Sequence, residues 1–115
     1  MQRRDYIIIE KILSEIKIAD EMLEDTDLNA FLSDEKLKRA VGMTVINIGE
    51  LVKNITEETR MKYRNVPWKA IAGLRDIAAH KYQTLRMEDV YNTAATDLPE
   101  LEKSLKHIIE CETDK

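Results

Sequence analysis

Apolar side chains recur at steps of three and four residues along four stretches of this chain. Residues 5–23 carry the first stripe, residues 37–55 the second, residues 67–80 the third and residues 87–108 the fourth. Because a helix turns once in about 3.6 residues, this spacing places the apolar side chains of each stretch on one face. The pattern predicts amphipathic helices that bury these faces against one another.

The second stripe is the most regular, and it contains Gly42 and Gly49, seven residues apart. A separation of seven places both glycines on the same helical face. A glycine in a helix interior costs about 1 kcal/mol relative to alanine. The presence of two therefore indicates that another backbone comes close to this face, where a side chain would not fit. Such a long, uniform stripe is typical of a bundle core or of a dimer seam, and the neighbouring backbone could belong to a second subunit.

Residues that favour helix ends separate the stripes. Ser33 is a suitable N-cap for the second main helix, and Thr56 for a short helix, or a continuation, over residues 57–64. Pro67 suits the first turn of the third main helix, because proline there sacrifices no intrahelical hydrogen bond. We therefore expect the third helix to begin near Pro67 and to run towards residue 80.

Three irregular features complete the sequence pattern. Residues 29–32 are expected to form a connector whose Phe31 docks onto the core. Pro99 falls inside the fourth stripe, where an interior proline costs about 3 kcal/mol, so a kink or short break is expected with Asp97 as the cap. The residues from Cys111 onward are expected to fray.

These elements predict an all-α, four-to-five-helix up-and-down bundle, formed by a single domain over residues 1–115. No stretch alternates apolar and polar residues as a half-buried strand does, and no internal repeat occurs. Only three Gly and two Pro are present, whereas sheets need frequent turns.

The composition also narrows the location of the protein. No apolar run approaches the roughly 18 to 20 residues of a membrane-spanning helix, or the about 7 to 15 of a signal peptide core. The single cysteine, Cys111, cannot form a disulfide within the chain. We expect a cytoplasmic protein that makes no contact with a membrane.

Positive charge is concentrated in one part of a chain whose net charge is −4. Residues 60–86 hold seven Lys and Arg against one Asp, a local net charge of +6. Such a block is the electrostatic footprint of a polyanion-binding surface, although a solvated face paired with acidic neighbours would look the same in sequence.

Three chemically capable residues lie inside this basic block. Arg75 is a fixed cation suited to bidentate phosphate contact, and His80 can accept or donate a proton near neutral pH. A cation that holds phosphate beside a general acid–base group is a minimal set for cleaving a phosphodiester. Tyr82 follows two residues after His80 and completes the candidate site.

The spacing of these residues bears on how the site is assembled. In one straight helix Arg75 and Tyr82 share a face, whereas Arg75 and His80 lie about 140° apart. Either the helix ends or kinks near His80, or a second copy of the chain completes the site. Two-fold symmetry would let both copies line one cleft, so the spacing hints at a homodimer.

Structural interpretations of these residues remain open. Arg75 could pair with Asp76 or Glu50 inside the bundle, Glu50 could equally be a surface acid, and His80 could be a structural residue at a helix end. We assign packing or structural roles to four further side chains: His107, Tyr6, Tyr63 and Tyr91. No Cys and His cluster has metal-ligand spacing and no phosphate-binding glycine loop is present, so neither a metal nor a cofactor is expected.

The series of Arg75, four residues, His80, one residue and Tyr82 resembles the motif of the HEPN superfamily, and within it the HepT-like toxins. The flanking segments also resemble the family, in order and spacing: Arg39-Ala40-Val41, Ile48-Gly49-Glu50, Val66-Pro67-Trp68, Ile71-Ala72-Gly73-Leu74-Arg75 and Asp97-Leu98-Pro99-Glu100-Leu101. The resemblance therefore runs over most of the chain, from about residue 5 to residue 108.

The resemblance implies a helical-bundle homodimer that acts as a metal-independent endoribonuclease on RNA. The Arg–His motifs of two protomers would meet in a cleft at the dimer interface. Arg75 would hold the scissile phosphate, and His80 would move the proton on or off the 2′-hydroxyl or the leaving oxygen. Asp76 and Lys81 would be supporting residues, and an acid at 76 could orient Arg75 or partly neutralise it.

The resemblance further implies a toxin–antitoxin system. Family members are commonly encoded beside a minimal nucleotidyltransferase (MntA-type) antitoxin, which transfers AMP to the motif tyrosine, here Tyr82. The adduct would place negative charge in the basic cleft and block RNA. Two alternatives remain: a non-catalytic module that binds such a nucleotidyltransferase or nucleotide, and a purely structural dimer.

Overall fold

The computed structural model describes the backbone of residues 1–81 and 87–113, and the side chains of residues 1–74 and 87–113. Within these residues every regular element is helical. In chain order the elements are α1 (Arg3–Met22), α2 (Leu28–Leu32), α3 (Glu35–Lys53), α4 (Glu57–Lys62), α5 (Trp68–Lys81), α6 (Met87–Asn92), the π-helical turn η1 (Thr93–Asp97) and α7 (Leu98–Thr113).

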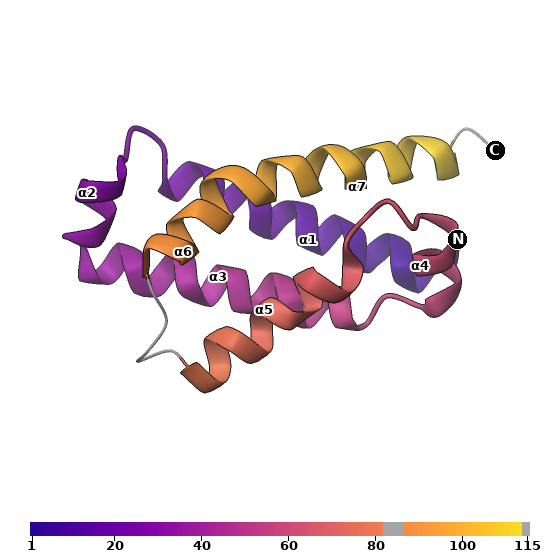
Figure 1. Ribbon diagram of the computed structural model, residues 1–115. Coiled ribbons are helices and arrows are strands. Elements are labelled where there is room, and N and C mark those ends of the chain that lie inside the picture. Colours follow the sequence, from indigo (N-terminus) through magenta and orange to yellow (C-terminus); the bar gives the residue numbers. More distant parts are fainter. Residues whose placement is uncertain (82–86, 114–115) are drawn as a thin grey trace.

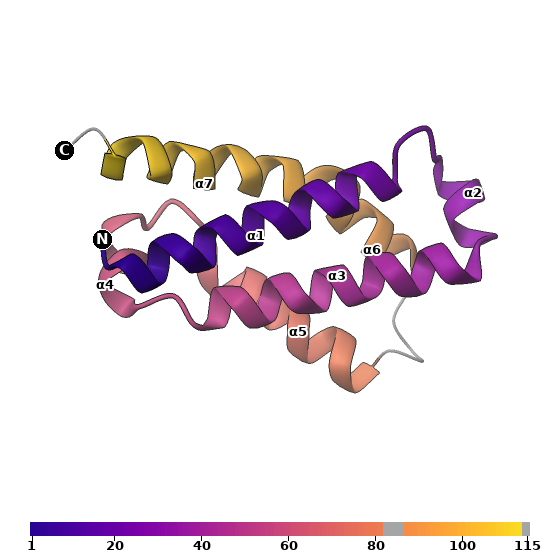
Figure 2. The ribbon, with the colours of Figure 1, turned by 180° about the vertical axis from the view of Figure 1, so that it is seen from behind.

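The long helices form an up-and-down bundle (Figure 1). Helices α1, α3 and α5 alternate in direction, and α6, η1 and α7 together form the fourth helical segment of the bundle. Helix α3 packs against both α1 and α5, while α7 packs against α1 (Figure 2). The short helix α2 lies at one end of the bundle, and α4 lies at the other end beside the N-terminus (Figure 1). The predicted all-α bundle is confirmed, and the homodimer stays a prediction.

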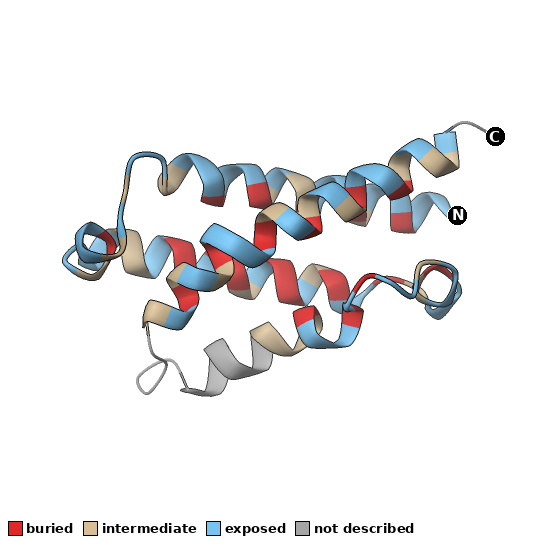
Figure 3. Ribbon diagram, turned by 45° about the horizontal axis from the view of Figure 1, so that its top comes forward, coloured by how far each residue is buried: buried red, intermediate tan, exposed pale blue. Residues whose placement is uncertain are grey.

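The core is built from the predicted apolar stripes (Figure 3). The three longest helices contribute these buried side chains: Ile9, Ile12, Ile16 and Ala19 from α1, Val41, Val45, Ile48 and Val52 from α3, and Leu98, Leu101, Leu105 and Ile108 from the fourth helical segment. Their outer faces are mostly polar, although Ile7 and Ile18 of α1 and Met43 of α3 are exposed. None of the described helices is both long and apolar enough to cross a bilayer.

Both glycines of the second stripe, Gly42 and Gly49, are buried within the single chain. Helix α3 lies between α1 and α5, so neighbouring backbone is available on two sides without a second subunit. The intramolecular interpretation of the stripe, as a bundle core, is sufficient to explain their burial.

The predicted connector at residues 29–32 is instead part of α2, so that prediction is wrong. Asp27 caps this short helix by accepting a hydrogen bond from the Ala30 amide over 2.8 Å. The docking of Phe31 is confirmed, because its side chain is fully buried with its ring centroid 5.4 Å from that of Tyr91. Burial of one large aromatic residue stabilises a helix that would be too short to form alone.

The N-cap predicted at Ser33 is also wrong by one position. Asp34 caps α3, and its carboxylate accepts a hydrogen bond from the Leu37 amide over 3.0 Å. Ser33 closes α2 instead, with its hydroxyl donating to the Asn29 carbonyl over 2.9 Å. A carboxylate at this position also interacts favourably with the helix dipole, which a neutral hydroxyl does only weakly.

The fourth helical segment of the bundle, formed by α6, η1 and α7, contains Pro99. Asp97 does not cap a new helix there, although the sequence predicted such a cap. The chain stays helical through the π-helical turn, which ends at Asp97, and Pro99 occupies the first turn of α7. A wider π turn just before the proline accommodates its missing N–H and its ring, so the expected kink takes this form.

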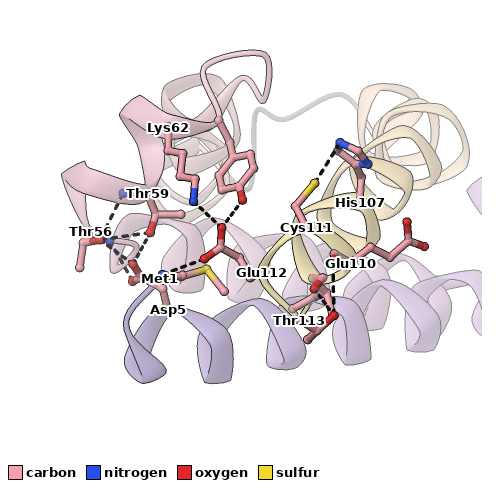
Figure 4. A network of polar contacts seen from close by, with 12 residues as sticks. Met1, Asp5, Thr56, Thr59, Lys62, His107, Glu110, Cys111, Glu112 and Thr113 are labelled. Carbon is pink, nitrogen blue, oxygen red and sulfur yellow. Dashed lines mark hydrogen bonds and ion pairs between the residues drawn. The ribbon is translucent and has the colours of Figure 1, made fainter. Parts of the chain in front are cut away.

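The end of the chain is more ordered than predicted. Helix α7 continues to Thr113, so the expected fraying from Cys111 is wrong for residues 111–113. Glu112 explains the difference: its carboxylate contacts the amino group of Met1 and the ammonium of Lys62, each at 2.7 Å, and accepts a hydrogen bond from the Tyr63 phenol (Figure 4).

Candidate active site

The start of α5, the helix that carries most of the candidate residues, is fixed by the loop before it. The Pro67 carbonyl accepts a hydrogen bond from the Ile71 amide over 3.1 Å, and the Trp68 indole N–H donates to the Tyr63 carbonyl over 3.0 Å. Val66 and Trp68 are buried. Since proline needs no acceptor for a missing N–H, it suits this first turn. The loop therefore fixes both the position and the direction of α5.

Four of the five candidate residues fall within the bounds of α5: Arg75, Asp76, His80 and Lys81. Their side chains lie outside the described part of the structure, and Tyr82 lies outside the described residues altogether. The third helix, predicted from Pro67 towards residue 80, is confirmed as Trp68–Lys81. The chemical roles assigned to the five residues stay predictions.

The helical backbone limits what one copy of the chain can assemble. Positions 75 and 80 both lie inside α5, which ends at Lys81. They are therefore about 140° apart around the helix axis and about 7.5 Å apart along it. The end of the helix comes after both positions and does not bring them to one side. Convergence on one phosphate requires a further element, and a second α5 is one that symmetry can supply.

Two of the cations in the basic block serve the fold. The Arg60 guanidinium donates hydrogen bonds to the carbonyls of Val52, Lys53 and Ile55, at 2.9, 3.1 and 3.2 Å. Two of these carbonyls belong to the last turn of α3 and the third to the residue just after its C-cap, so Arg60 closes the end of that helix. Lys62 is paired with Glu112. Pairing with an acidic neighbour is thus confirmed for Lys62, whereas Arg60 binds backbone carbonyls instead.

Two other cations of the block are differently placed. Arg64 and Lys69 are exposed, and neither forms an ion pair with the described residues. Arg64 lies within the loop that leads into α5, and Lys69 lies in the first turn of that helix. The block charge was visible in the sequence, but only the structure separates the cations that close helices from those that face solvent.

Three of the four side chains to which the sequence assigned packing or structural roles make polar contacts within the chain. Tyr91 donates its phenol hydrogen bond to the Thr26 carbonyl over 3.0 Å, and Tyr63 reaches Glu112. The His107 Nε2 atom lies 3.4 Å from the Cys111 sulfur on the exposed side of α7 (Figure 4). Tyr6 is 36% exposed, so most of its side chain is covered while part of it faces solvent, as an amphipathic packing residue does.

Glu50 lies on the surface of α3. It lines a groove of about 370 Å³ between α1 and α3, together with Lys11, Ser14 and Asn47. Its exposed position agrees with the interpretation as a surface acid, and a role in the site stays a prediction. The pairing with Arg75 that the sequence left open involves a side chain outside the described part.

Comparison with known proteins identifies the family. Residues 12–108 match the model of the HepT-like ribonucleases, so the chain belongs to this family, whose HEPN-type helical bundle agrees with the observed fold. A protein of Caldanaerobacter subterraneus named "Putative RNase" is 38% identical over 104 residues, which cover 90% of this chain and 93% of that protein.

Two archaeal relatives are similar over comparable lengths. A "Putative RNase" of Methanocaldococcus jannaschii is 34% identical over 110 residues, 95% of each chain. A "Probable ribonuclease HepT" of Thermococcus cleftensis is 29% identical over 101 residues, 88% of this chain and 92% of that protein. No solved structure matches this chain.

Proposed function

We propose that this protein is a metal-independent endoribonuclease that acts as the toxin of a toxin–antitoxin pair. The observation that carries the proposal is the family match over residues 12–108, which encloses Arg75, His80 and Tyr82 at the spacing of the family motif. The relatives named as ribonucleases, one of them 38% identical to this chain, support the same class of reaction.

The proposed reaction uses the RNA's own nucleophile. His80 removes the proton of a 2′-hydroxyl, and the 2′-oxygen attacks the adjacent phosphorus while the bond to the 5′-oxygen breaks. The 5′-oxygen takes a proton from water as it leaves, His80 later returns its proton to solvent, and the products end in a 2′,3′-cyclic phosphate and a 5′-hydroxyl. Arg75 neutralises the charge that develops on the phosphoryl oxygens. Because no water has to be ionised, the reaction needs no metal.

We propose that two copies of the chain form each active site. Positions 75 and 80 face different sides of α5, so Arg75 of one protomer and His80 of its partner would act on one phosphate. A two-fold axis would produce two such pairs in one cleft.

We further propose that a nucleotidyltransferase antitoxin silences the enzyme by transferring AMP to Tyr82. The new phosphate carries negative charge and competes for the cation that would otherwise hold the substrate phosphate. The basic character of residues 60–86 supports this mode of inhibition, because an anionic adduct is attracted to the surface that binds RNA.

The proposal is tested by incubating the purified protein, free of any Tyr82 adduct, with RNA in EDTA. Wild type should release fragments with cyclic phosphate ends, whereas Arg75→Ala and His80→Ala should lose at least about a hundredfold in rate. His107→Ala and Arg39→Ala are the matched controls, since both residues are exposed and outside α5. Intact RNA with folded, unmodified wild type would contradict the proposal and favour a binding module.

A further inference from the structure

A shallow groove lies where α4, the following loop and the first turn of α5 meet. It has a volume of about 830 Å³, and its charged lining consists of Glu57, Arg60, Arg64 and Lys69. Three cations against one acid make this surface positive within a protein whose net charge is −4. A local excess of this kind selects an anionic ligand in spite of the overall charge.

The cations of the groove differ in their freedom to meet a ligand. Arg60 keeps its charge but is held in place by the carbonyls at the end of α3. Arg64 and Lys69 are exposed and make no ion pair in the part of the chain that the structure describes. Two unpaired cations in the lining of one groove are suited to contacts with the phosphates of a single strand.

The rest of the lining indicates which part of a nucleic acid would be bound. Trp68 also lines the groove but is only 5% exposed, and its indole N–H is already donated to Tyr63. Met61, at 53% exposed, is the large apolar side chain that faces solvent there. Without an exposed aromatic ring in this lining, base stacking is not favoured, so contacts would go to phosphate and sugar.

The groove includes the first turn of α5, the helix that carries the motif positions 75 and 80. Position 80 lies eleven residues after Lys69, which places the two about 20° apart around the helix and about 16 Å apart along it. Gly73 lies between them on the same face, and a Cβ atom built there meets nothing within 4 Å. An extended strand that leaves the groove therefore finds open space beside Gly73.

We propose that this groove is an accessory RNA site that holds the sugar–phosphate backbone on one side of the cleaved bond, with Arg64 and Lys69 as its phosphate contacts. This inference rests on the proposed ribonuclease function and adds to it a substrate contact outside the Arg75–His80 motif. Since the contacts go to the backbone, the groove contributes affinity for long RNA and no sequence selectivity.

The test compares the double variant Arg64→Gln and Lys69→Gln with a control, Lys17→Gln and Lys106→Gln. The control removes the same two charges from exposed positions on α1 and α7. Binding of a fluorescent single-stranded 20-nucleotide RNA is measured at several salt concentrations in a His80→Ala background. The groove variant should bind at least about tenfold more weakly, and its salt slope should fall by about 1.4, or about 0.7 for each lost phosphate contact.

Cleavage separates this role from catalysis. With His80 restored, the groove variant should cut the 20-nucleotide RNA with a raised KM and cut a dinucleotide at the wild-type rate. Equal binding by the groove and control variants would overturn the inference, as would a matching loss of dinucleotide cleavage, which would place both residues at the reacting phosphate. Wild type that binds RNA through this groove but cuts nothing would refute the proposed nuclease and leave the groove intact.

Discussion

The hydroxyl of Thr59 donates a 2.6 Å hydrogen bond to the carboxylate of Asp5, although 54 residues separate them in sequence. Asp5 is fully buried and also accepts a hydrogen bond from the Thr56 amide over 3.0 Å (Figure 4). This contact joins the first turn of α1 to the N-terminus of α4. Because α4 leads through a short loop into α5, it helps to position the helix of the candidate site.

Asp5→Ala should lower the free energy of unfolding by about 2 to 3 kcal/mol. The substitution leaves the buried Thr59 hydroxyl and the Thr56 amide without their acceptor, and unsatisfied buried donors carry this order of cost. Asp20→Ala, at an exposed position of the same helix, should change stability by less than about 0.5 kcal/mol. Urea unfolding of both variants measures the difference, and equal stabilities would show that the contact contributes nothing.

Lowering the pH should remove the contribution that Asp5 makes to the stability of the fold. Burial raises the pKa of this carboxyl, but hydrogen bonds from Thr56 and Thr59 outweigh burial and leave the pKa below its ordinary value. A pKa that is lower in the folded state stabilises the fold fully above the unfolded value, about 4, and loses that effect as the pH falls through the folded value. The stability difference between wild type and Asp5→Asn should therefore shrink below about pH 4, as measured by denaturant unfolding across this range. A difference that stays constant with pH would refute this account.

Raising the pH should remove the stabilisation that the hydrogen bond between Tyr63 and Glu112 gives the fold. Burial, together with the hydrogen bond to the Glu112 carboxylate, raises the pKa of Tyr63 to about 12. The stabilisation is complete below the unfolded pKa, about 10, and is lost as the pH rises through the folded value. Ultraviolet titration of tyrosinate, taken as the difference from Tyr63→Phe, should show Glu112→Gln lowering this pKa. Glu110→Gln, at an exposed position, should leave it unchanged.

Gly73→Ala should stabilise the protein by about 0.5 to 1 kcal/mol. The new methyl group meets no atom within 4 Å, so the higher helix propensity of alanine acts without a steric cost. Ala70→Gly, on the exposed side of the same helix, should lower stability by a similar amount. Thermal unfolding of the pair checks both signs, and a less stable Gly73→Ala would show that this face of α5 is covered.

Much of the fold follows from local patterns in the sequence. The stripes of α1 and α3 predicted both the helices and their buried faces, because periodicity reports burial directly. Thr56 was recognised as a cap because its partner, the Thr59 amide, lies three residues away. The misplaced cap at Ser33 arose because two adjacent residues were both suitable, and only the local backbone distinguishes them.

Hydrogen bonds between residues far apart in the sequence could not be predicted. The sequence assigned no partner to Asp5 and placed Glu112 in a fraying tail, because their partners lie 54 and 49 residues away. The same distinction between local and long-range features applies to the candidate site. The sequence correctly placed positions 75 and 80 on one helix, but their convergence depends on tertiary or quaternary contacts that no local pattern encodes.

The central claim is that two copies of the chain share each ribonuclease site, and mixing inactive variants tests it most directly. Arg75→Ala and His80→Ala proteins, each inactive alone, are unfolded together, refolded, and purified as the mixed dimer through different affinity tags. If Arg75 of one protomer acts with His80 of its partner, the mixed dimer holds one intact site and should recover about half of the wild-type RNA cleavage in EDTA. A mixed dimer as inactive as its parents, beside active wild type treated identically, would contradict the shared site.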